Sequence, residues 1–170
     1  MNKVLLTGAS HGLGRSALDV LVDKNVAVTA VARNVRDLQQ VQGIQMAGAA
    51  LQTDKHFAQI DLQPTDLSQI SQREALNLLQ GHDTVWHCAA KSSPWGKYEQ
   101  FYASNVHATA QMAQAAGQAG VQTFVHISTP SLYFDFQHHH NIAETYLPTT
   151  FANHYAQTKW LAEQKVLQAA

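Results

Sequence analysis

The chain has 170 residues, of which 45% are hydrophobic and 14% charged, a composition typical of one folded globular domain rather than a disordered segment. Its formal net charge of −1 gives no electrostatic reason to expect nucleic acid or an anionic membrane as a partner. A single cysteine and the lack of a signal-peptide pattern predict a cytoplasmic protein. No apolar run reaches the ~20 residues that a membrane span needs. The length predicts one domain over residues 1–170.

The first apolar run, residues 3–6, leads directly into three glycines, Gly8, Gly12 and Gly14, and an amphipathic segment follows. This order predicts a strand, a tight turn and a helix start, which together present free backbone N–H groups to a phosphate. Gly8 would permit the turn, Gly12 the close approach of a pyrophosphate, and Gly14 the packing of the helix. A glycine-rich turn that binds nothing is the alternative, because glycine triplets alone are a weak signal.

Hydrophobic periodicity predicts the remaining elements. Helices are expected over residues 13–24, 37–41, 66–79, 95–117 and 151–169, and strands over 26–32, 57–62, 84–90 and 122–128. Residues 43–53 are rich in alanine and glutamine and are expected to form a loop with an irregular helix. Because strands alternate with helices, the pattern predicts the α/β class: a Rossmann-like, doubly wound parallel sheet of about five strands with helices on both faces.

Five motifs follow one another along the chain: Thr7-Gly8-x-x-x-Gly12-x-Gly14, Asp61-Leu62, Cys88-Ala89-Ala90, Ser128-Thr129 and Tyr155-x-x-x-Lys159. In order and spacing this set resembles the short-chain dehydrogenase/reductase superfamily over essentially the whole chain. The second half is most similar to the extended branch, which includes nucleotide-sugar epimerases and dehydratases and 3β-hydroxysteroid dehydrogenases. The glycine spacing is more like that of the shorter, single-domain branch. Because extended members continue beyond the Tyr–Lys helix into a substrate-binding part, we expect that part to be missing here.

The resemblance assigns Tyr155 as the general acid/base that moves a proton on the substrate oxygen during hydride transfer. Lys159 lies one helical turn later, and its positive charge would favour the phenolate form of the tyrosine. In the family this lysine also holds the nicotinamide ribose. A Tyr and a Lys four residues apart on a surface helix are common, so the pair depends on the preceding motifs for its meaning.

Three further residues are candidates for the catalytic site. By resemblance, the Thr129 hydroxyl would hydrogen-bond and orient the substrate oxygen, and Ser128 exchanges roles with it if the alignment slips by one residue. A hydroxyl at a strand end that caps local backbone is the alternative. Asn105 matches the family asparagine that helps to build the proton relay, and a polar residue on a helix surface is its alternative reading.

The expected phosphate-binding residues are those of the glycine loop: Gly8, Ser10, His11, Gly12, Leu13 and Gly14. The second strand ends in Ala32-Arg33-Asn34, without the acidic residue that would hold the ribose 2′-hydroxyl of NAD. Arg33 offers a planar array of donors suited to a phosphate, and NADP-preferring relatives often place a basic residue at the position of His11. We therefore expect NADP(H), with NAD(H) as the alternative.

The resemblance also places residues around the two rings of the cofactor. Asp61 and Leu62 would flank the adenine, with the carboxylate accepting from its amino group. Ala89 and Ala90 would line the nicotinamide side, where small side chains let the ring approach the strand.

No metal site is expected. His138, His139 and His140 are consecutive, so their side chains point in different directions, and no cysteine or carboxylate set accompanies them at ligand spacing. A solvated loop is the preferred interpretation of this segment. Cys88 lies in an apolar strand and is expected to be a buried small residue rather than a nucleophile.

The leading hypothesis is an NAD(P)-dependent oxidoreductase that acts on an alcohol or carbonyl group of a small-molecule substrate. A nucleotide-sugar epimerase or dehydratase is the close alternative, because it would use the same residues. A non-catalytic NADP-binding regulatory module is the third hypothesis. Family members commonly dimerise through two long helices, here residues 95–117 and 151–169, so a homodimer is also expected.

Overall fold

The computed structural model describes residues 3–34, 36–37, 39, 60–143 and 145–170. Five parallel strands form one sheet in the order β3-β2-β1-β4-β5. Their bounds are Lys3–Thr7 (β1), Ala27–Ala32 (β2), Ile60–Pro64 (β3), Thr84–His87 (β4) and Thr123–His126 (β5). The chain winds outward from β1 to β3 and then returns to the other side of β1. This reversal creates a crevice at the carboxyl ends of β1 and β4, where ligands bind in open α/β sheets.

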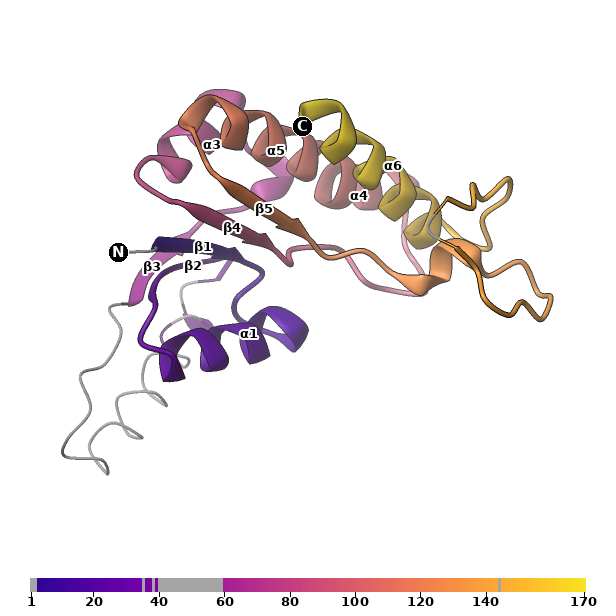
Figure 1. The fold of residues 1–170 in the computed structure, drawn as a ribbon, viewed down its shortest axis with the longest axis horizontal. Coiled ribbons are helices and arrows are strands. Elements are labelled where there is room, and N and C mark those ends of the chain that lie inside the picture. The colour runs from indigo at the N-terminus through magenta and orange to yellow at the C-terminus, as the bar shows by residue number, and fades with distance from the viewer. Residues whose placement is uncertain (1–2, 35, 38, 40–59, 144) are drawn as a thin grey trace.

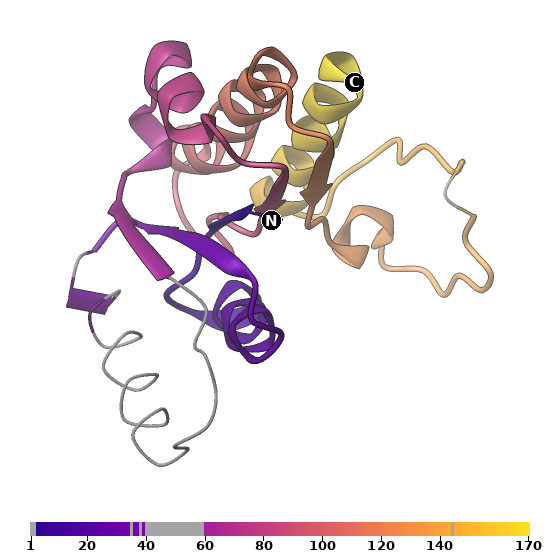
Figure 2. The ribbon, with the colours of Figure 1, turned by 60° about the vertical axis from the view of Figure 1, so that its left-hand side comes forward.

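Helices cover both faces of the sheet, as Figures 1 and 2 show. α1 (Gly12–Asp23) packs on one face, and α3 (Gln72–Leu79), α5 (Ala108–Ala119) and α6 (His154–Ala169) lie on the other. Successive strand residues point to opposite faces. Leu6 therefore joins the core beneath α1 with Leu18, while Leu5 joins the opposite core with Met112. The expected α/β class with a Rossmann-like, doubly wound sheet is confirmed.

Local capping explains where several helices begin. Ser71 and Glu74 form a capping box, in which the Ser71 hydroxyl accepts from the Glu74 N–H and the Glu74 carboxylate accepts from the Ser71 N–H. Asn153 caps α6 by accepting from the Ala156 N–H at 2.9 Å. Both cap residues are short polar side chains that bond the exposed amides of a first turn.

Several element bounds differ from those expected, including the strands predicted over 84–90 and 122–128, which end at His87 and His126. The helix predicted over 66–79 is a short 3-10 helix, Leu67–Gln69, followed by α3, because Ile70 and Ser71 are extended. The strand predicted over 57–62 runs from Ile60 to Pro64. The helix predicted over 95–117 begins only at α4 (Tyr98–Phe101) and continues through a π-helical turn, Tyr102–His107, into α5. The prediction for 43–53 lies outside the described residues, and so does much of that for 37–41.

Within the described part of the chain, no helix has both the length and the apolar character needed to span a membrane.

Candidate functional site

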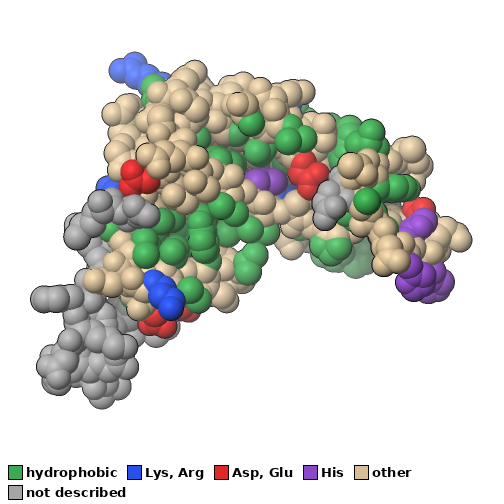
Figure 3. Space-filling view, in the orientation of Figure 1, with side chains coloured by type: hydrophobic (Ala, Val, Ile, Leu, Met, Phe, Trp, Pro, Cys, Tyr) green, Lys and Arg blue, Asp and Glu red, His purple; other side chains and the backbone are tan. Residues whose placement is uncertain are grey.

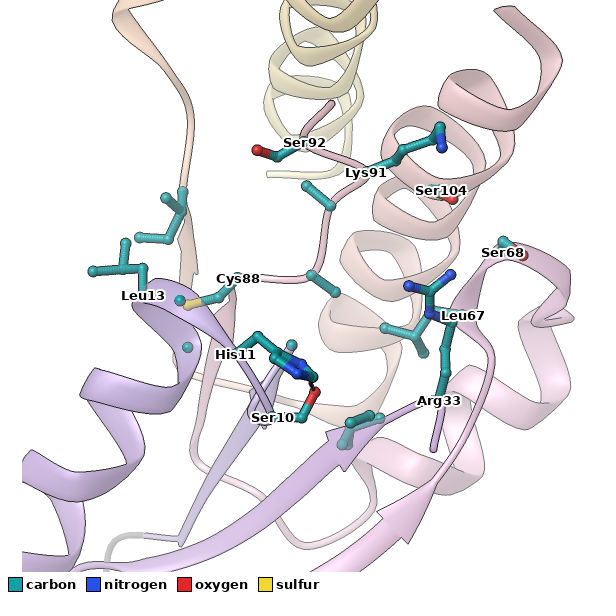
Figure 4. A pocket seen from close by; sticks show the side chains of 18 of the residues that line it. Ser10, His11, Leu13, Arg33, Leu67, Ser68, Cys88, Lys91, Ser92 and Ser104 are labelled. Atoms are coloured by element: carbon teal, nitrogen blue, oxygen red, sulfur yellow. Dashed lines mark hydrogen bonds between the residues drawn. The ribbon is translucent and has the colours of Figure 1, made fainter. Parts of the chain in front are cut away.

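A cavity of about 430 Å³ opens at the carboxyl ends of the central strands (Figure 4). Its wall combines the glycine loop with segments that follow β2, β3, β4 and β5 and with the first turns of α6. Twelve of the residues expected from the sequence line it: Gly8, Ser10, His11, Gly12, Leu13, Gly14, Arg33, Ala89, Ala90, Ser128, Tyr155 and Lys159. Residues 147 positions apart in the sequence, Gly8 and Tyr155, therefore share one cavity.

The glycine loop packs closely against the residues that follow β4. Gly8 has a φ of +69°, and a Cβ there would come within 2.9 Å of the Ala89 nitrogen. The Thr7 hydroxyl accepts from the same Ala89 N–H at 3.1 Å. A Cβ on Gly14 would overlap the Gly8 carbonyl. Only glycine permits both the left-handed turn at Gly8 and the close approach of α1 to it.

The start of α1 is suited to an anionic group. His11 occupies the N-cap position without making a side-chain cap, and the first turn carries no acidic residue. The amide groups of this turn are therefore left for another acceptor, at the positive end of the helix dipole. Gly12 has a φ of +54°, and a Cβ there would meet none of the described residues within 4 Å. Backbone amides beside open space are the features that a pyrophosphate requires, so these residues fit a dinucleotide.

Arg33 follows β2 and lines the cavity beside Leu67, as Figure 4 shows. Its neighbours in this wall come from the segment just after β3: Thr65, Asp66 and Ser68. Asp66 accepts from the Ser68 N–H at 3.0 Å and thereby caps the short 3-10 helix. On the loop, the Ser10 hydroxyl and His11 Nδ1 are 2.8 Å apart.

The expected placement of Asp61 and Leu62 at a strand end is wrong. Asp61 is the second residue of β3, in register with Thr29, and its carboxylate accepts from the Gln63 side-chain amide at 3.0 Å. Leu62 packs against the core beneath α1. β3 continues to Pro64, so Asp66 and Leu67 reach the cavity in their place. The capping-box pattern Ser71-x-x-Glu74 could have moved the predicted helix start from residue 66 to residue 72, which leaves room for the strand to continue beyond Leu62.

Asn34 also lies away from the cavity wall. Its side chain accepts from the Arg36 N–H at 2.9 Å and stabilises the turn that follows β2. This is the local side-chain to backbone bond that asparagine commonly makes in turns.

Tyr155 and Lys159 both lie on α6 and both line the cavity. Lys159 is only 2% exposed. Its ammonium donates to the Ile127 carbonyl, and Nζ lies 3.1 Å from His126 Nε2. Burial lowers the pKa of Lys159 to about 8, although the charge of Glu163 and the nearby Cys88 thiol act in the opposite direction.

Of the two hydroxyl candidates, Ser128 lines the cavity and Thr129 does not. Thr129 is the N-cap of the 3-10 helix Pro130–Tyr133, and its hydroxyl accepts from the Ser131 N–H at 3.2 Å. The capping role that was the alternative for this pair is thus taken by Thr129. The Ser128 hydroxyl oxygen is buried and has no hydrogen-bond partner among the described residues. An unpaired buried hydroxyl at a cavity wall is free to bond a ligand.

Asn105 lies in the π-helical turn, 1% exposed, and does not reach the cavity. It accepts from the Lys91 N–H at 2.7 Å, and its amide donates to the Lys91 carbonyl at 3.3 Å and to the Thr158 hydroxyl at 3.0 Å. The Thr158 hydroxyl donates to the His154 carbonyl at 2.7 Å. Asn105 therefore ties the cavity wall at Lys91 to the helix that bears Tyr155 and Lys159. We call these three residues, Lys91, Asn105 and Thr158, the asparagine clamp.

His87, the last residue of β4, is a buried polar residue that does not line the cavity. Its two ring nitrogens lie 3.0 Å from the Thr7 hydroxyl and 2.9 Å from the Thr109 hydroxyl. Burial, with the neighbouring His126 ring and the positive charge of Lys159 acting in the same direction, holds the pKa of His87 well below its ordinary value. The imidazole is therefore neutral at neutral pH and bridges β1 to α5.

Two expectations concerned residues outside the proposed chemistry. Cys88 is half-buried and lines the cavity, and burial raises the pKa of its thiol, which disfavours the reactive thiolate. His138, His139 and His140 are exposed on the projecting segment between β5 and α6, where Figure 3 shows histidine side chains at the far end. The structure, over the residues it describes, places no three histidine, cysteine or carboxylate side chains where they could hold a metal ion together.

Known proteins resemble this chain over nearly all of its length. An uncharacterised protein of Escherichia coli K12, YbjS, is 39% identical over 166 residues, which are 96% of this chain and 44% of that protein. A Stigmatella aurantiaca enzyme, named 4-hydroxy-2-methyl-3-oxo-4-farnesyl-3,4-dihydroquinoline-1-oxide ketoreductase, is 32% identical over 98% of this chain and 46% of its own length. The chain thus spans less than half the length of these relatives.

The fold also matches that of solved structures over nearly the whole chain. MoeE5, solved in complex with UDP-glucuronic acid and NAD, superposes with a TM-score of 0.76 at 23% identity, over 99% of this chain and 49% of that one. The model of the NAD-binding family described as "Male sterility protein" matches residues 6–170. The chain therefore belongs to this NAD-binding family, in agreement with the resemblance of its motifs to the short-chain dehydrogenase/reductase superfamily.

Proposed function

We propose that the protein uses NADP(H) to reduce a carbonyl group, or to oxidise the corresponding alcohol, with Tyr155 as the general acid/base. The observation that carries the proposal is that Ser128, Tyr155 and Lys159 line the same cavity as the glycine loop. A bound nicotinamide supplies or accepts the hydride. The protein then has to bind the substrate oxygen and move one proton to or from it.

The three side chains divide this work. The unpartnered Ser128 hydroxyl donates to the substrate oxygen and orients it. Tyr155 delivers the proton to that oxygen during reduction and takes it back during oxidation. The buried ammonium of Lys159 stabilises the phenolate that remains after proton delivery, because a positive charge is poorly screened when it is removed from water.

Carbonyl reduction is favoured over epimerisation by the comparisons. The Stigmatella relative, at 32% identity, is named a ketoreductase. The likeness to a protein solved with UDP-glucuronic acid, at 23% identity, concerns the fold alone. Epimerisation would use the same tyrosine, lysine and hydroxyl. The experiment therefore also includes nucleotide-sugar substrates, which are assayed for epimerisation.

The preference for NADP(H) is proposed from the wall around Arg33. The guanidinium is a bidentate donor for a phosphate, and it follows β2 where NAD-specific sites carry an acidic residue. Asp66 lies in the same wall, but one of its carboxylate oxygens already accepts from the Ser68 N–H. His11 and Ser10 add polar groups from the glycine loop.

The test of the reaction is Tyr155→Phe, with Tyr133→Phe as the matched control. Tyr133 lies outside the cavity lining and packs against Tyr146, with ring centroids 6.0 Å apart. Oxidation of NADPH is followed with a panel of 3-oxo acids and ketones, and a UDP-sugar panel is assayed for epimerisation. We expect the Tyr155 variant to lose turnover at least 100-fold while its affinity for NADPH stays within about twofold. Unchanged turnover in this variant would refute the acid/base role.

A further inference from the structure

The buried ammonium of Lys159 has few hydrogen-bond partners. An ammonium carries three N–H donors and no acceptor. In the described part of the chain, two groups accept from it: the Ile127 carbonyl and Nε2 of His126. Both belong to β5 or the residue after it, so the end of this strand holds the lysine against the sheet.

This contact determines which nitrogen of His126 carries the proton. Because Lys159 only donates, Nε2 has to accept, and the neutral ring then carries its hydrogen on Nδ1. Nδ1 is itself buried and has no partner among the described residues. Burial, with the charge of Lys159 adding to it, lowers the pKa of His126 to about 3. The imidazole is therefore a neutral acceptor throughout the pH range in which Lys159 loses its proton.

The surrounding elements add few charges. From β4, the ring of His87 stacks on that of His126 with centroids 5.7 Å apart, and it is neutral. The Cys88 thiol follows the same strand and is protonated. From α6 come Lys159 itself and Glu163, whose charge acts on the lysine.

We propose that His126 is a positioning residue for Lys159: its Nε2 and the Ile127 carbonyl hold two of the three ammonium hydrogens and leave the third for the contents of the cavity. The role in the reaction rests on the proposed function of Lys159, whereas the contact itself does not. An uncharged acceptor suits this task, because it fixes the ammonium without cancelling the positive charge that favours the Tyr155 phenolate.

The first measurement is the tautomer of His126 in the 170-residue chain, read from long-range ¹H–¹⁵N correlations of the histidine rings. We expect hydrogen on Nδ1 only, unchanged between pH 5 and 8. Hydrogen on Nε2 in this range would overturn the proposal, because that nitrogen could not then accept from the ammonium. This measurement requires neither cofactor nor substrate.

The second measurement compares His126→Leu with His126→Gln by following the titration of the Lys159 side chain in ¹³C-detected spectra. Leucine removes the acceptor, and we expect the pKa of Lys159 to fall by about one unit, as for the loss of one hydrogen bond to a charged group. Glutamine can present its carbonyl oxygen in place of Nε2, so we expect it to restore the wild-type titration. Equal titrations in the leucine variant and the wild type would overturn the proposal.

His82→Leu is the control for the loss of a buried imidazole. His82 is 7% exposed and its Nε2 lies 2.8 Å from the Thr29 hydroxyl, but it does not line the cavity. We expect this variant to leave the Lys159 titration unchanged.

NADPH binding tests the role of Lys159 separately from its contact with His126. We expect His126→Leu to weaken NADPH binding about tenfold and His126→Gln less than threefold. A normal Nδ1–H tautomer and a shifted Lys159 titration, with unchanged NADPH affinity, would support the contact and refute the expectation, from the family resemblance, that Lys159 holds the nicotinamide ribose.

Discussion

The asparagine clamp gives the sharpest energetic prediction. Thr158 is fully buried, and its hydroxyl accepts from the Asn105 amide at 3.0 Å while donating to the His154 carbonyl at 2.7 Å. Thr158→Val replaces this hydroxyl with a methyl group of nearly the same shape. The Asn105 amide is then left with the Lys91 carbonyl alone, at 3.3 Å.

The expected loss follows from leaving buried polar groups without partners. Such a loss costs about 1–3 kcal/mol, which for a chain of this length lowers the melting temperature by roughly 2–12 °C. Thr158→Ser keeps the hydroxyl and removes one buried methyl group, at a cost of about 1 kcal/mol. We therefore expect the serine variant to retain the cofactor affinity of the wild type, and the valine variant to lose part of it as Lys91 is released.

A double-mutant cycle identifies the hydrogen bond itself. Thr158→Val, Asn105→Ala and the double variant are unfolded in urea, and the interaction energy is taken from the three differences. Residues that share a hydrogen bond typically couple by about 0.5–3 kcal/mol. Additivity within about 0.3 kcal/mol would refute the idea that the two side chains act as one unit.

Three further predictions concern the cofactor wall, the glycine loop and the buried imidazoles. Wild type should bind NADPH more tightly than NADH in a fluorescence titration, and Arg33→Ala should erase the difference; equal affinities in the wild type would contradict the argument. Gly14→Ala should abolish NADPH binding because the new Cβ meets the Gly8 carbonyl. In the control, Gly117→Ala, the new Cβ would meet only the Ala169 carbonyl, at 3.8 Å. This control should stabilise α5 by up to about 1 kcal/mol in urea unfolding. His126 takes up a proton below about pH 6.5 in the unfolded chain, but only near pH 3 in the folded one. The free energy of unfolding should therefore fall as the pH drops through this window, by up to about 1.4 kcal/mol per pH unit. His126→Gln should show a shallower fall in urea midpoints between pH 7 and 5.

Much of the fold could be predicted because its signals are local. Each buried parallel strand is a short, continuous apolar run, and residues 26–32 carry such a run without a polar interruption other than Thr29. The glycine loop and the pair Tyr155 and Lys159 are recognised from the order and spacing of the motifs together along the chain. These residues therefore reached the cavity as expected.

The errors arose where tertiary packing decides the outcome. Apolar periodicity does not locate a strand end to within about three residues: the strand was expected to end at Leu62 and ends at Pro64. Asp66 and Leu67, rather than Asp61 and Leu62, therefore line the cavity. Ser128 and Thr129 are adjacent hydroxyls, and only the cap at Thr129 determines which of them faces the cavity. Asn105 lies in the π-helical turn and bonds the Lys91 backbone and the Thr158 hydroxyl, and its part in a proton relay stays a prediction.

Tertiary packing also explains why the sequence did not predict the hydrogen-bond partner of Lys159. His126 is one polar residue in an apolar strand, and nothing in the sequence within one turn of Lys159 points to it. The sheet places the end of β5 beneath α6, and only this packing brings the imidazole to 3.1 Å from the ammonium. A carboxylate in that position would bind Lys159 more strongly and raise its pKa, but it would also cancel the charge that acts on Tyr155. An imidazole kept neutral by its burial provides the hydrogen bond and leaves the charge available to the reaction.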